Sequence, residues 1–451
     1  MRKVYVTGIG VVSSLSHNLD QFWRGCLAGQ SQIEEVPREW GAYYDAKSRF
    51  WSPLELPDYD SFEINSAYAA PRDTAVLNAV VASESAIRHS GLQADVKDIK
   101  SRRYMLRGVR ELYAGVFCGT GLGCITSILD SYVPHLLARA FGPALCDIGA
   151  RKPGDPWQEL KNNLSANPRV SPLASLRSMS SSLSSSVSIR YGFKGPSETI
   201  FAACASGASA VLRGLNEIRT GRLDLALCGG SEYFGDRAGS VFMAFDRLGA
   251  LARGAHGRNR INRPFDTERS GFLFSQGGAC MLVLESEEFL KSRRGTALAE
   301  LAGGFSTSDA ASLVSIDPED TTIHLAINGA LADARESLGS VDYVNAHGTG
   351  TETNDAVEAA TIRRLFGYKP LVNSTKSLLG HTIGASGAFG VAVTALSLRD
   401  QIVHPSLNVE TPVAAIRIPS GAERAVLKVA ITQNFGFGGH NVVLVLRQPS
   451  D

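Results

Sequence analysis

Cys204 is the residue whose surroundings are best suited to nucleophilic chemistry. It lies in the segment TIFAACASGASAV (residues 199–211), where a strand-like run meets small residues that open a helix. Unpaired amides and the positive end of the helix dipole favour a thiolate there, and small neighbours admit a long substrate. Because free cysteines are commonly buried apolar residues, a tightly packed turn is the structural alternative.

Two histidines occupy glycine-rich loops further along the chain. His347 lies in YVNAHGTGTETNDAVE (residues 343–358), at the end of a predicted strand, where the sites of α/β folds gather. His381 lies in NSTKSLLGHTIGASGA (residues 373–388), with Lys376 on the other side of the loop. A single loop histidine is more often structural. Packing does not readily explain why one cysteine and two histidines all lie in glycine-rich segments. Their combination therefore indicates a common active site.

The fourth segment, QNFGFGGHN (residues 433–441), alternates phenylalanine and glycine beside the last predicted strand. This pattern places large rings next to bare backbone. We expect Phe435 to gate a pocket, with its backbone amide donating to an oxyanion. The alternative is a glycine-rich bulge whose aromatic rings belong to the core.

The composition is that of a folded globular protein without a strong charge of either sign. Hydrophobic residues make up 44% of the 451 residues, charged residues make up 20%, and the net charge is +1. No global field would gather nucleic acid or anionic lipid, so neither is an expected partner. The seven cysteines have no metal-binding spacing and are odd in number, so neither a metal site nor a disulfide framework is expected.

Neither a targeting signal nor a membrane span is expected. The first residues, MRKVYVTGIGVVSSLS, are interrupted by glycine too often for a signal peptide. No stretch reaches the ~18–20 apolar residues of a spanning helix. The expected location is therefore cytoplasmic.

Short apolar runs alternate with helical patterns along the chain, which predicts a layered α/β fold. The clearest helices are expected over residues 74–89, 208–220 and 387–399. Residues 25–62 and 137–169 are irregular in pattern and are expected to form loops or caps. No convincing internal repeat is visible in the residues, so a duplication has to be tested by the structure.

Several motifs together resemble the signature blocks of the thiolase-superfamily ketosynthases, specifically the elongating β-ketoacyl-[acyl-carrier-protein] synthase II type and its polyketide relatives. The blocks that carry the resemblance are VTGIGVVSSLS, IRYGFKGPSETIFAACASG, RPFDTERSGF and NFGFGGHNVVLVL. The resemblance implies a duplicated five-layer α/β/α/β/α fold. It also implies an N-terminal half at residues 1–255, with the cysteine and the irregular caps, and a C-terminal half at residues 256–451, with both histidines.

The resemblance also implies a reaction, the decarboxylative Claisen condensation of fatty-acid or polyketide biosynthesis. Cys204 would accept an acyl chain from an acyl carrier protein, with the amides of Cys204 and Phe435 holding the oxyanion. His347 and His381, kept neutral, would stabilise the enolate that forms when a malonyl carrier loses carbon dioxide. No cofactor is implied, because the phosphopantetheine arm arrives on the carrier protein.

Supporting roles follow from the same motifs. Thr349 and Thr351 match positions that bind the phosphopantetheine arm, and their structural alternative is loop capping. Lys376 matches the lysine that orients the decarboxylating histidine. Asp355 and Glu358 match acids that stand behind the site, although carboxylates are also favoured at the start of a helix.

Three residues depart from the pattern of the resembled family. Gly390 stands where a glutamate usually pairs with the lysine, Gln276 replaces an acid, and His440 replaces a threonine. These changes lead to the hypothesis of a specialised pathway enzyme. The resemblance implies a dimer, either a homodimer or a heterodimer with a chain-length partner.

Two alternative functions stay open at this point. The first is an acyltransferase or decarboxylase on the same scaffold that does not elongate. The second is a non-catalytic chain-length subunit, which the retention of Cys204, His347 and His381 opposes.

Overall fold

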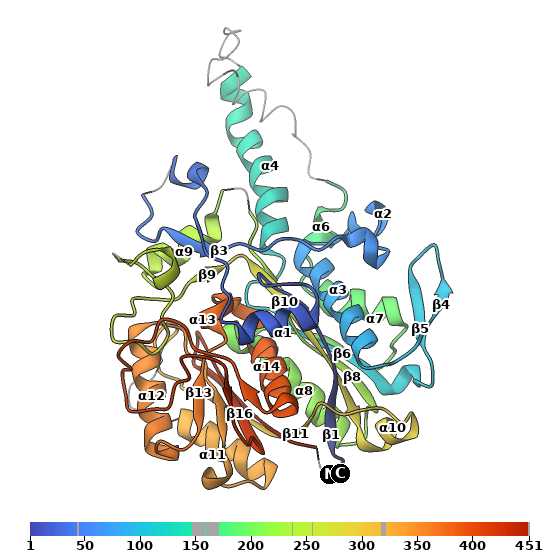
Figure 1. Ribbon diagram of the computed structural model, residues 1–451. Helices are drawn as coiled ribbons and strands as arrows, with labels where there is room; N and C mark the ends of the chain where they lie inside the picture. The colour runs from blue at the N-terminus through green and yellow to red at the C-terminus, as the bar shows by residue number, and fades with distance from the viewer. Residues whose placement is uncertain are drawn as a thin grey trace.

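The computed structural model describes residues 1–42, 45–146, 158, 171–236, 238–254, 256–316 and 322–449 (Figure 1). Strands and helices alternate throughout, as the hydrophobic pattern predicts. No helix in these ranges is long and apolar enough to cross a membrane.

Ten strands form one hydrogen-bonded sheet in the order β13-β12-β16-β17-β11-β1-β10-β8-β6-β7. They are β1 (Val4–Val12), β6 (Ala114–Gly119), β7 (Ser197–Ile200), β8 (Leu225–Tyr233), β10 (Gly277–Ser286), β11 (Ala299–Ser308), β12 (Tyr343–Asn345), β13 (Leu371–Asn373), β16 (Val429–Gly436) and β17 (His440–Arg447). From the centre outward, the first half runs β1-β10-β8-β6-β7 and the second runs β11-β17-β16-β12-β13. When the strands of each half are numbered along the chain, both halves have the same spatial order. The fold is therefore duplicated.

Helices form three layers around these two sets of strands. They are α3 (Thr74–His89) and α7 (Ser182–Tyr191) on one outer face, α8 (Ser206–Arg219) and α14 (Ser386–Asp400) in the centre, and α11 (Ile323–Ala334) and α12 (Glu352–Phe366) on the other outer face. This arrangement confirms the predicted five-layer α/β/α/β/α fold. The three clearest predicted helices also lie within two residues of their observed bounds.

Each inner strand supplies side chains to two different cores because successive residues point to opposite faces. Along β10, residues 279, 281 and 283 pack in the core under α3, whereas residues 280, 282 and 284 pack in the central core with α8 and α14. Along β17, residues 443 and 445 pack under α11, and residues 442, 444 and 446 face the central helices. The middle residues of such strands are apolar on both faces, as expected for a sheet that is covered on both sides.

The predicted boundary between residues 255 and 256 stays a prediction, and Ala255 lies outside the described residues. As strand pairing defines them, the halves meet through a short antiparallel ladder that pairs Tyr5 with Glu300 and Val6 with Ala299. The strand β10 pairs with β1 and β8 and so completes the first set of strands.

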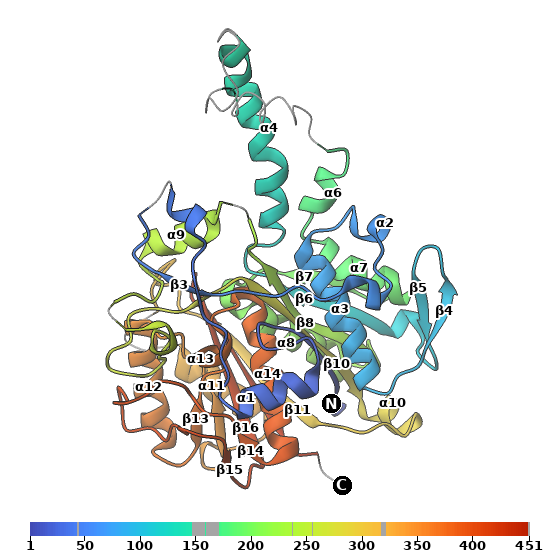
Figure 2. The ribbon, with the colours of Figure 1, turned by 45° about the horizontal axis from the view of Figure 1, so that its top comes forward.

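The first predicted cap is tied to the body through β3 (Phe50–Ser52), which pairs with β9 (Phe274–Ser275). The second was expected to be irregular from residue 137, but the helix α4 (Ile125–Cys146) continues through its first part and projects from the body (Figure 2). Residues 147–157 and 159–170 of that cap lie outside the described residues.

The remaining elements are short. They are α1 (Leu19–Leu27), α2 (Ser66–Ala69), α6 (Ala174–Ser178), α9 (Ser240–Leu248), α10 (Glu287–Ser292), α13 (Lys376–Leu379), β2 (Glu34–Glu35), β4 (Ala94–Asp98), β5 (Arg103–Leu106), β14 (Ile402–Val403), β15 (Glu423–Arg424) and the 3-10 turns η1 (Arg38–Ala42), η2 (Tyr59–Phe62), η3 (Glu111–Tyr113), η4 (Ala203–Ala205), η5 (Arg258–Arg260), η6 (Leu338–Ser340) and η7 (Ile383–Ala385).

The two central helices meet at their N-terminal turns, where the residues ACASGA (203–208) and IGASGA (383–388) are equivalent by the duplication. A Cβ on Gly207 would lie 2.9 Å from the backbone nitrogen of Ala388, and a Cβ on Gly387 would lie 2.5 Å from that of Ala208. Only glycine allows backbones to approach this closely.

We therefore expect Gly207→Val to be strongly destabilising, because its side chain would collide with the backbone of the other central helix. Overpacking of this kind costs about 1–3 kcal/mol. Thermal unfolding should show a lower midpoint for this variant. The control is Ser209→Val, a β-branched change at a half-buried position two residues further along α8. Equal midpoints for the two variants would contradict a tight helix crossing.

Candidate active site

Cys204 lies in a strained turn between the end of β7 and the start of α8. Ala203 has a φ of 48°, in the left-handed region that residues with a side chain rarely adopt. The hydroxyl of Ser206 accepts a hydrogen bond of 2.8 Å from the backbone of Ala202 and so holds the turn. Cys204 is 5% exposed. The left-handed conformation of Ala203 costs free energy locally. It accompanies a turn that places the Cys204 side chain in the lining of a pocket.

Burial raises the pKa of the Cys204 thiol to about 11. The positive charge of Lys376 and a hydrogen bond from the backbone of Phe437 lower it, but less than burial raises it. The expected thiolate is therefore not the resting form, because loss of hydration outweighs the helix end and the nearby cation.

The second side chain of the pocket is His381, on the loop between α13 and η7. Its backbone N–H donates to the carbonyl of Leu273 at 2.8 Å, and its Nδ1 accepts a 3.1 Å hydrogen bond from the backbone N–H of Ile383. Burial and the nearby Lys376 hold the pKa of His381 well below its usual value. The ring is consequently neutral, with its proton on Nε2.

The third side chain is His347, on the loop that follows β12. The carboxylate of Glu358 accepts 2.7 Å hydrogen bonds from the backbone N–H groups of His347 and Gly348, which fixes this loop. Lys376 Nζ donates to the His347 carbonyl at 2.6 Å and lies 3.3 Å from Nδ1. Burial lowers the pKa of His347 well below its usual value. With Nδ1 accepting from the lysine, the ring proton is on Nε2.

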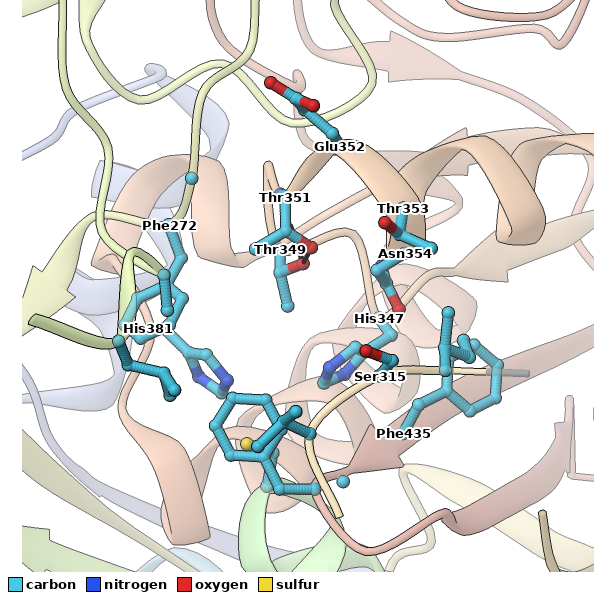
Figure 3. Close-up of a pocket in the computed structure, with 18 of the residues that line it drawn as sticks. Phe272, Ser315, His347, Thr349, Thr351, Glu352, Thr353, Asn354, His381 and Phe435 are labelled. Carbon is cyan, nitrogen blue, oxygen red and sulfur yellow. Dashed lines mark hydrogen bonds between the residues drawn. The ribbon is translucent and has the colours of Figure 1, made fainter. Parts of the chain in front are cut away.

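These three side chains line one pocket of about 460 Å³. The rings of His347 and His381 lie opposite each other in the pocket, nearly perpendicular and with their centroids 5.7 Å apart (Figure 3). Phe272 packs edge-on against His381, and Phe435 packs against His347, with ring centroids 5.0 and 5.5 Å apart. The structure therefore brings together a thiol and two neutral imidazoles from both halves of the fold.

The oxyanion role expected of the Phe435 amide stays a prediction, and the structure places another amide at the thiol. The backbone N–H of Phe437, two residues further on, is the one that hydrogen-bonds to the Cys204 sulfur. Gly436 lies between them, and a Cβ there would come within 3.3 Å of the Cys204 nitrogen. The sharp turn after β16 presents the later amide to the sulfur and leaves the Phe435 ring against His347.

Thr349 and Thr351 line the same pocket, and their hydroxyl oxygens lie 2.9 Å apart. Above the histidines, they present polar groups to the pocket, where Figure 3 also shows Asn354 and Glu352. Asp355 is fully buried behind them and accepts hydrogen bonds from the backbone of Phe265 at 2.6 Å and of Gly350 at 3.1 Å. It holds the loop and does not line the pocket.

Lys376 has no carboxylate within ion-pair distance in the described part of the chain. Burial lowers its pKa, and burial raises the pKa of the neighbouring Glu358. At position 390, where the resembled family has a glutamate, a Cβ would lie 2.7 Å from Thr432 Oγ1 and 2.8 Å from Asn345 Oδ1. These two side chains fill the space that such a glutamate would need.

The other two departures from the family pattern lie outside the pocket. Gln276 accepts a 2.9 Å hydrogen bond from the backbone of Leu54 and thereby fastens the first cap. His440 is exposed at the start of β17, and nothing in the structure explains its identity.

Some pocket residues were not found from the sequence. Asn441 lines the pocket and donates a 2.6 Å hydrogen bond to Asp309, which also lines it. Phe272 lies within the motif RPFDTERSGF but has no chemical signal of its own. For Phe437, the repeated Phe-Gly pattern was the available signal, and only the register of the turn decides between the two phenylalanines.

We expect alkylation of Cys204 by iodoacetamide to accelerate with pH up to about 11, because burial raises the thiol pKa. Burial lowers the pKa of Lys376 to about 8, so this side chain is charged only below that pH. Lys376→Met should therefore slow alkylation below about pH 8 by about tenfold, since removal of a nearby cation disfavours the thiolate. Mass spectrometry of the modified peptide measures the rate, and the exposed Lys369→Met is the control. An unchanged or faster rate below pH 8 in Lys376→Met would contradict this electrostatic coupling.

Comparison with known proteins identifies the family. The β-ketoacyl synthase N-terminal domain model matches residues 1–288, and the C-terminal domain model matches residues 298–410. The 3-oxoacyl-[acyl-carrier-protein] synthase 2 of Coxiella burnetii is 30% identical over 100% of this chain and 99% of its own length.

Two solved structures extend this similarity to the whole fold. The ishigamide ketosynthase/chain length factor is 26% identical with a TM-score of 0.81. A type II polyketide ketosynthase, solved with its acyl-carrier protein and bound to the hexaketide, is 26% identical with a TM-score of 0.82. Each match covers 100% of both chains. From its motifs, its duplicated fold and these matches, the chain belongs to the β-ketoacyl synthase family.

Proposed function

We propose that this chain condenses a Cys204-bound acyl group with a malonyl group on an acyl carrier protein, releasing carbon dioxide. The observation that supports this most directly is the pocket shared by one thiol and two neutral imidazoles with Nε2–H groups. A hydrolase would instead need a basic imidazole beside the nucleophile, and here burial suppresses that basicity.

In the first half-reaction, the Cys204 sulfur attacks the carbonyl carbon of the acyl thioester. The thiol proton leaves, the carrier thiol is released, and the acyl group remains on the sulfur. The backbone N–H groups of Cys204 and Phe437 are suited to hold the oxyanion of the tetrahedral intermediate, because such donors need no reorganisation. The Lys376 cation favours the thiolate that this step requires.

In the second half-reaction, the carbon–carbon bond to the malonyl carboxylate breaks and its electron pair forms an enolate. The Nε2–H groups of His347 and His381 donate to the enolate oxygen, which is where negative charge develops. The enolate carbon then attacks the thioester, and Cys204 leaves as a thiolate that regains a proton. Neutral donors suit this step, since an imidazolium would protonate the carbanion equivalent and end the reaction without elongation.

We also propose that no cofactor takes part and that the phosphopantetheine arm of the carrier reaches the pocket past Thr349 and Thr351. One of the two solved relatives was determined with its acyl-carrier protein, which supports a carrier-bound substrate here. The cytoplasmic location and the specialised pathway stay predictions.

His347→Ala and His381→Ala should separate the two half-reactions. Each variant should still take up an acyl group on Cys204, because neither imidazole is needed as its base. Decarboxylation of the malonyl carrier should fall about 10²–10³-fold, as when an oxyanion donor is removed. Intact-protein mass reports acylation, and released carbon dioxide reports decarboxylation.

One outcome would contradict the proposal that the imidazoles act in decarboxylation and not in acylation, and a second would contradict elongation. Loss of acylation in both variants would make the imidazoles general bases for the thiol. Rapid decarboxylation with no product lengthened by two carbons in the wild type would favour the non-elongating alternative.

We further propose that the chain works as a dimer, either with itself or with a chain-length partner such as the one named for the ishigamide enzyme. The strand β7 supports this, since it ends the sheet with one edge unpaired in the described structure, and Phe201 directly after it is 54% exposed.

The variant Phe201→Glu should shift a dimer toward monomer, because a charge would be buried at the interface. Light scattering during gel filtration measures the mass against the 48.1 kDa of one chain. The control is Leu325→Glu, where the leucine is equally exposed, at 52%, on α11 of the other half. Unchanged dimer mass in Phe201→Glu would exclude this edge as the interface.

A further inference from the structure

His404 lies behind the active site, in a buried polar network that reaches Thr375, the residue before Lys376. It is fully buried, and its side chain does not reach the pocket. Its Nδ1 lies 2.7 Å from the carbonyl oxygen of Pro405, and its Nε2 lies 3.2 Å from the hydroxyl of Thr375. Thr375 directly precedes Lys376 and occupies the N-cap position of the short helix α13 without a side-chain capping bond.

The direction of each hydrogen bond in this network can be assigned. A carbonyl oxygen only accepts, so Nδ1 of His404 carries the ring proton and Nε2 is an acceptor. The Thr375 hydroxyl must then donate to Nε2, and it accepts in turn from Asn345 Nδ2 at 2.9 Å. Burial lowers the pKa of His404 to about 4, which agrees with a neutral ring in this tautomer.

The network occupies the place where the family pattern has a carboxylate. Asn345 Oδ1 and Thr432 Oγ1 lie where a side chain at Gly390 would project. Asn345 also donates to Asn373 at 3.1 Å, and Asn373 donates to the His404 carbonyl at 2.8 Å. All members of this network are neutral, and the Lys376 ammonium hydrogen-bonds only to His347 within the described part of the chain.

We propose that His404 is a positioning residue that, through Thr375, fixes the start of α13 and thereby aims Lys376 at His347. In this chain a neutral chain of hydrogen bonds replaces the lysine–glutamate pair. The mechanical link is short, because the Thr375 hydroxyl and the Lys376 backbone belong to adjacent residues of one buried turn. The inference rests on the proposed function only for its effect on catalysis.

Three variants separate the two hydrogen bonds of the imidazole. The amide of His404→Asn can donate to the Pro405 carbonyl from the place of Nδ1 but is too short to reach Thr375. The amide oxygen of His404→Gln can reach Thr375 and accept from it as Nε2 does. His404→Leu makes neither bond. A role in simple packing would require similar behaviour of all three.

The first readout is the pH profile of Cys204 alkylation, which needs no substrate. The thiol faces Lys376 from α13 and Glu232 from β8, and behind Lys376 stand Glu358 and Asp355 of α12. Lys376 is charged only below about pH 8, so a displaced ammonium would stabilise the thiolate less in that range. We expect alkylation below about pH 8 to slow, and this part of the profile to shift upward, in His404→Asn and His404→Leu, and we expect the profile of His404→Gln to coincide with that of the wild type.

The second readout is malonyl-carrier decarboxylation, where kcat should fall about tenfold in the Asn and Leu variants with KM unchanged. Wild-type profiles in all three variants would overturn the inference, as would equal shifts in all three with lowered thermal stability. A wild type that decarboxylates nothing would refute the proposed function alone, since the alkylation profiles would still decide the role of His404.

Discussion

The N-terminal turns of α8 and α14 approach so closely that there is no room for a side chain at Gly207 or Gly387. Each of these glycines faces the backbone of the opposite helix, and Gly384 packs against the loop after β6, with 2.3 Å between its Cβ position and the Gly121 nitrogen. Each turn directly precedes its helix and carries one strained residue, Ala203 or Ile383, both at φ 48°. This contact brings the nucleophile of one half beside His381 of the other.

The same close packing buries the three side chains, and this burial sets the protonation of the site. Burial makes the free thiol a weak acid and both imidazoles very weak bases. The groups are consequently neutral at rest, and charge appears only when the substrate supplies it. Fixed donors compensate for the lost hydration: the amide of Phe437 at the sulfur, the amide of Ile383 at His381, and Lys376 at His347. Fixed dipoles in a buried site stabilise an oxyanion and an enolate more strongly than water does.

Short sequence motifs were enough to predict Cys204, His347 and His381 as site residues, because each lies where a strand, a glycine-rich loop and a helix follow one another in the sequence. The layered fold followed from the alternation of apolar strands and helical patterns. The amide of Phe437 could not be predicted, since the register of a tight turn decides which N–H faces the sulfur. The thiol pKa could not be predicted, because it depends on burial in three dimensions. The duplication was not visible in the sequence, because the two halves share mainly the four residues ASGA. His404 lies far from Lys376 in sequence, so no local pattern could connect them.

The most direct test of a single pocket serving both half-reactions is a single-turnover rapid-quench experiment. Protein already acylated on Cys204 is mixed with an equal amount of malonyl carrier, and three signals are followed: released carbon dioxide, the remaining acyl-Cys204, and the lengthened product. The structure predicts one rate constant for all three, because the enolate forms beside the thioester. Carbon dioxide released well ahead of thioester loss, with the acyl group left on the sulfur, would contradict it.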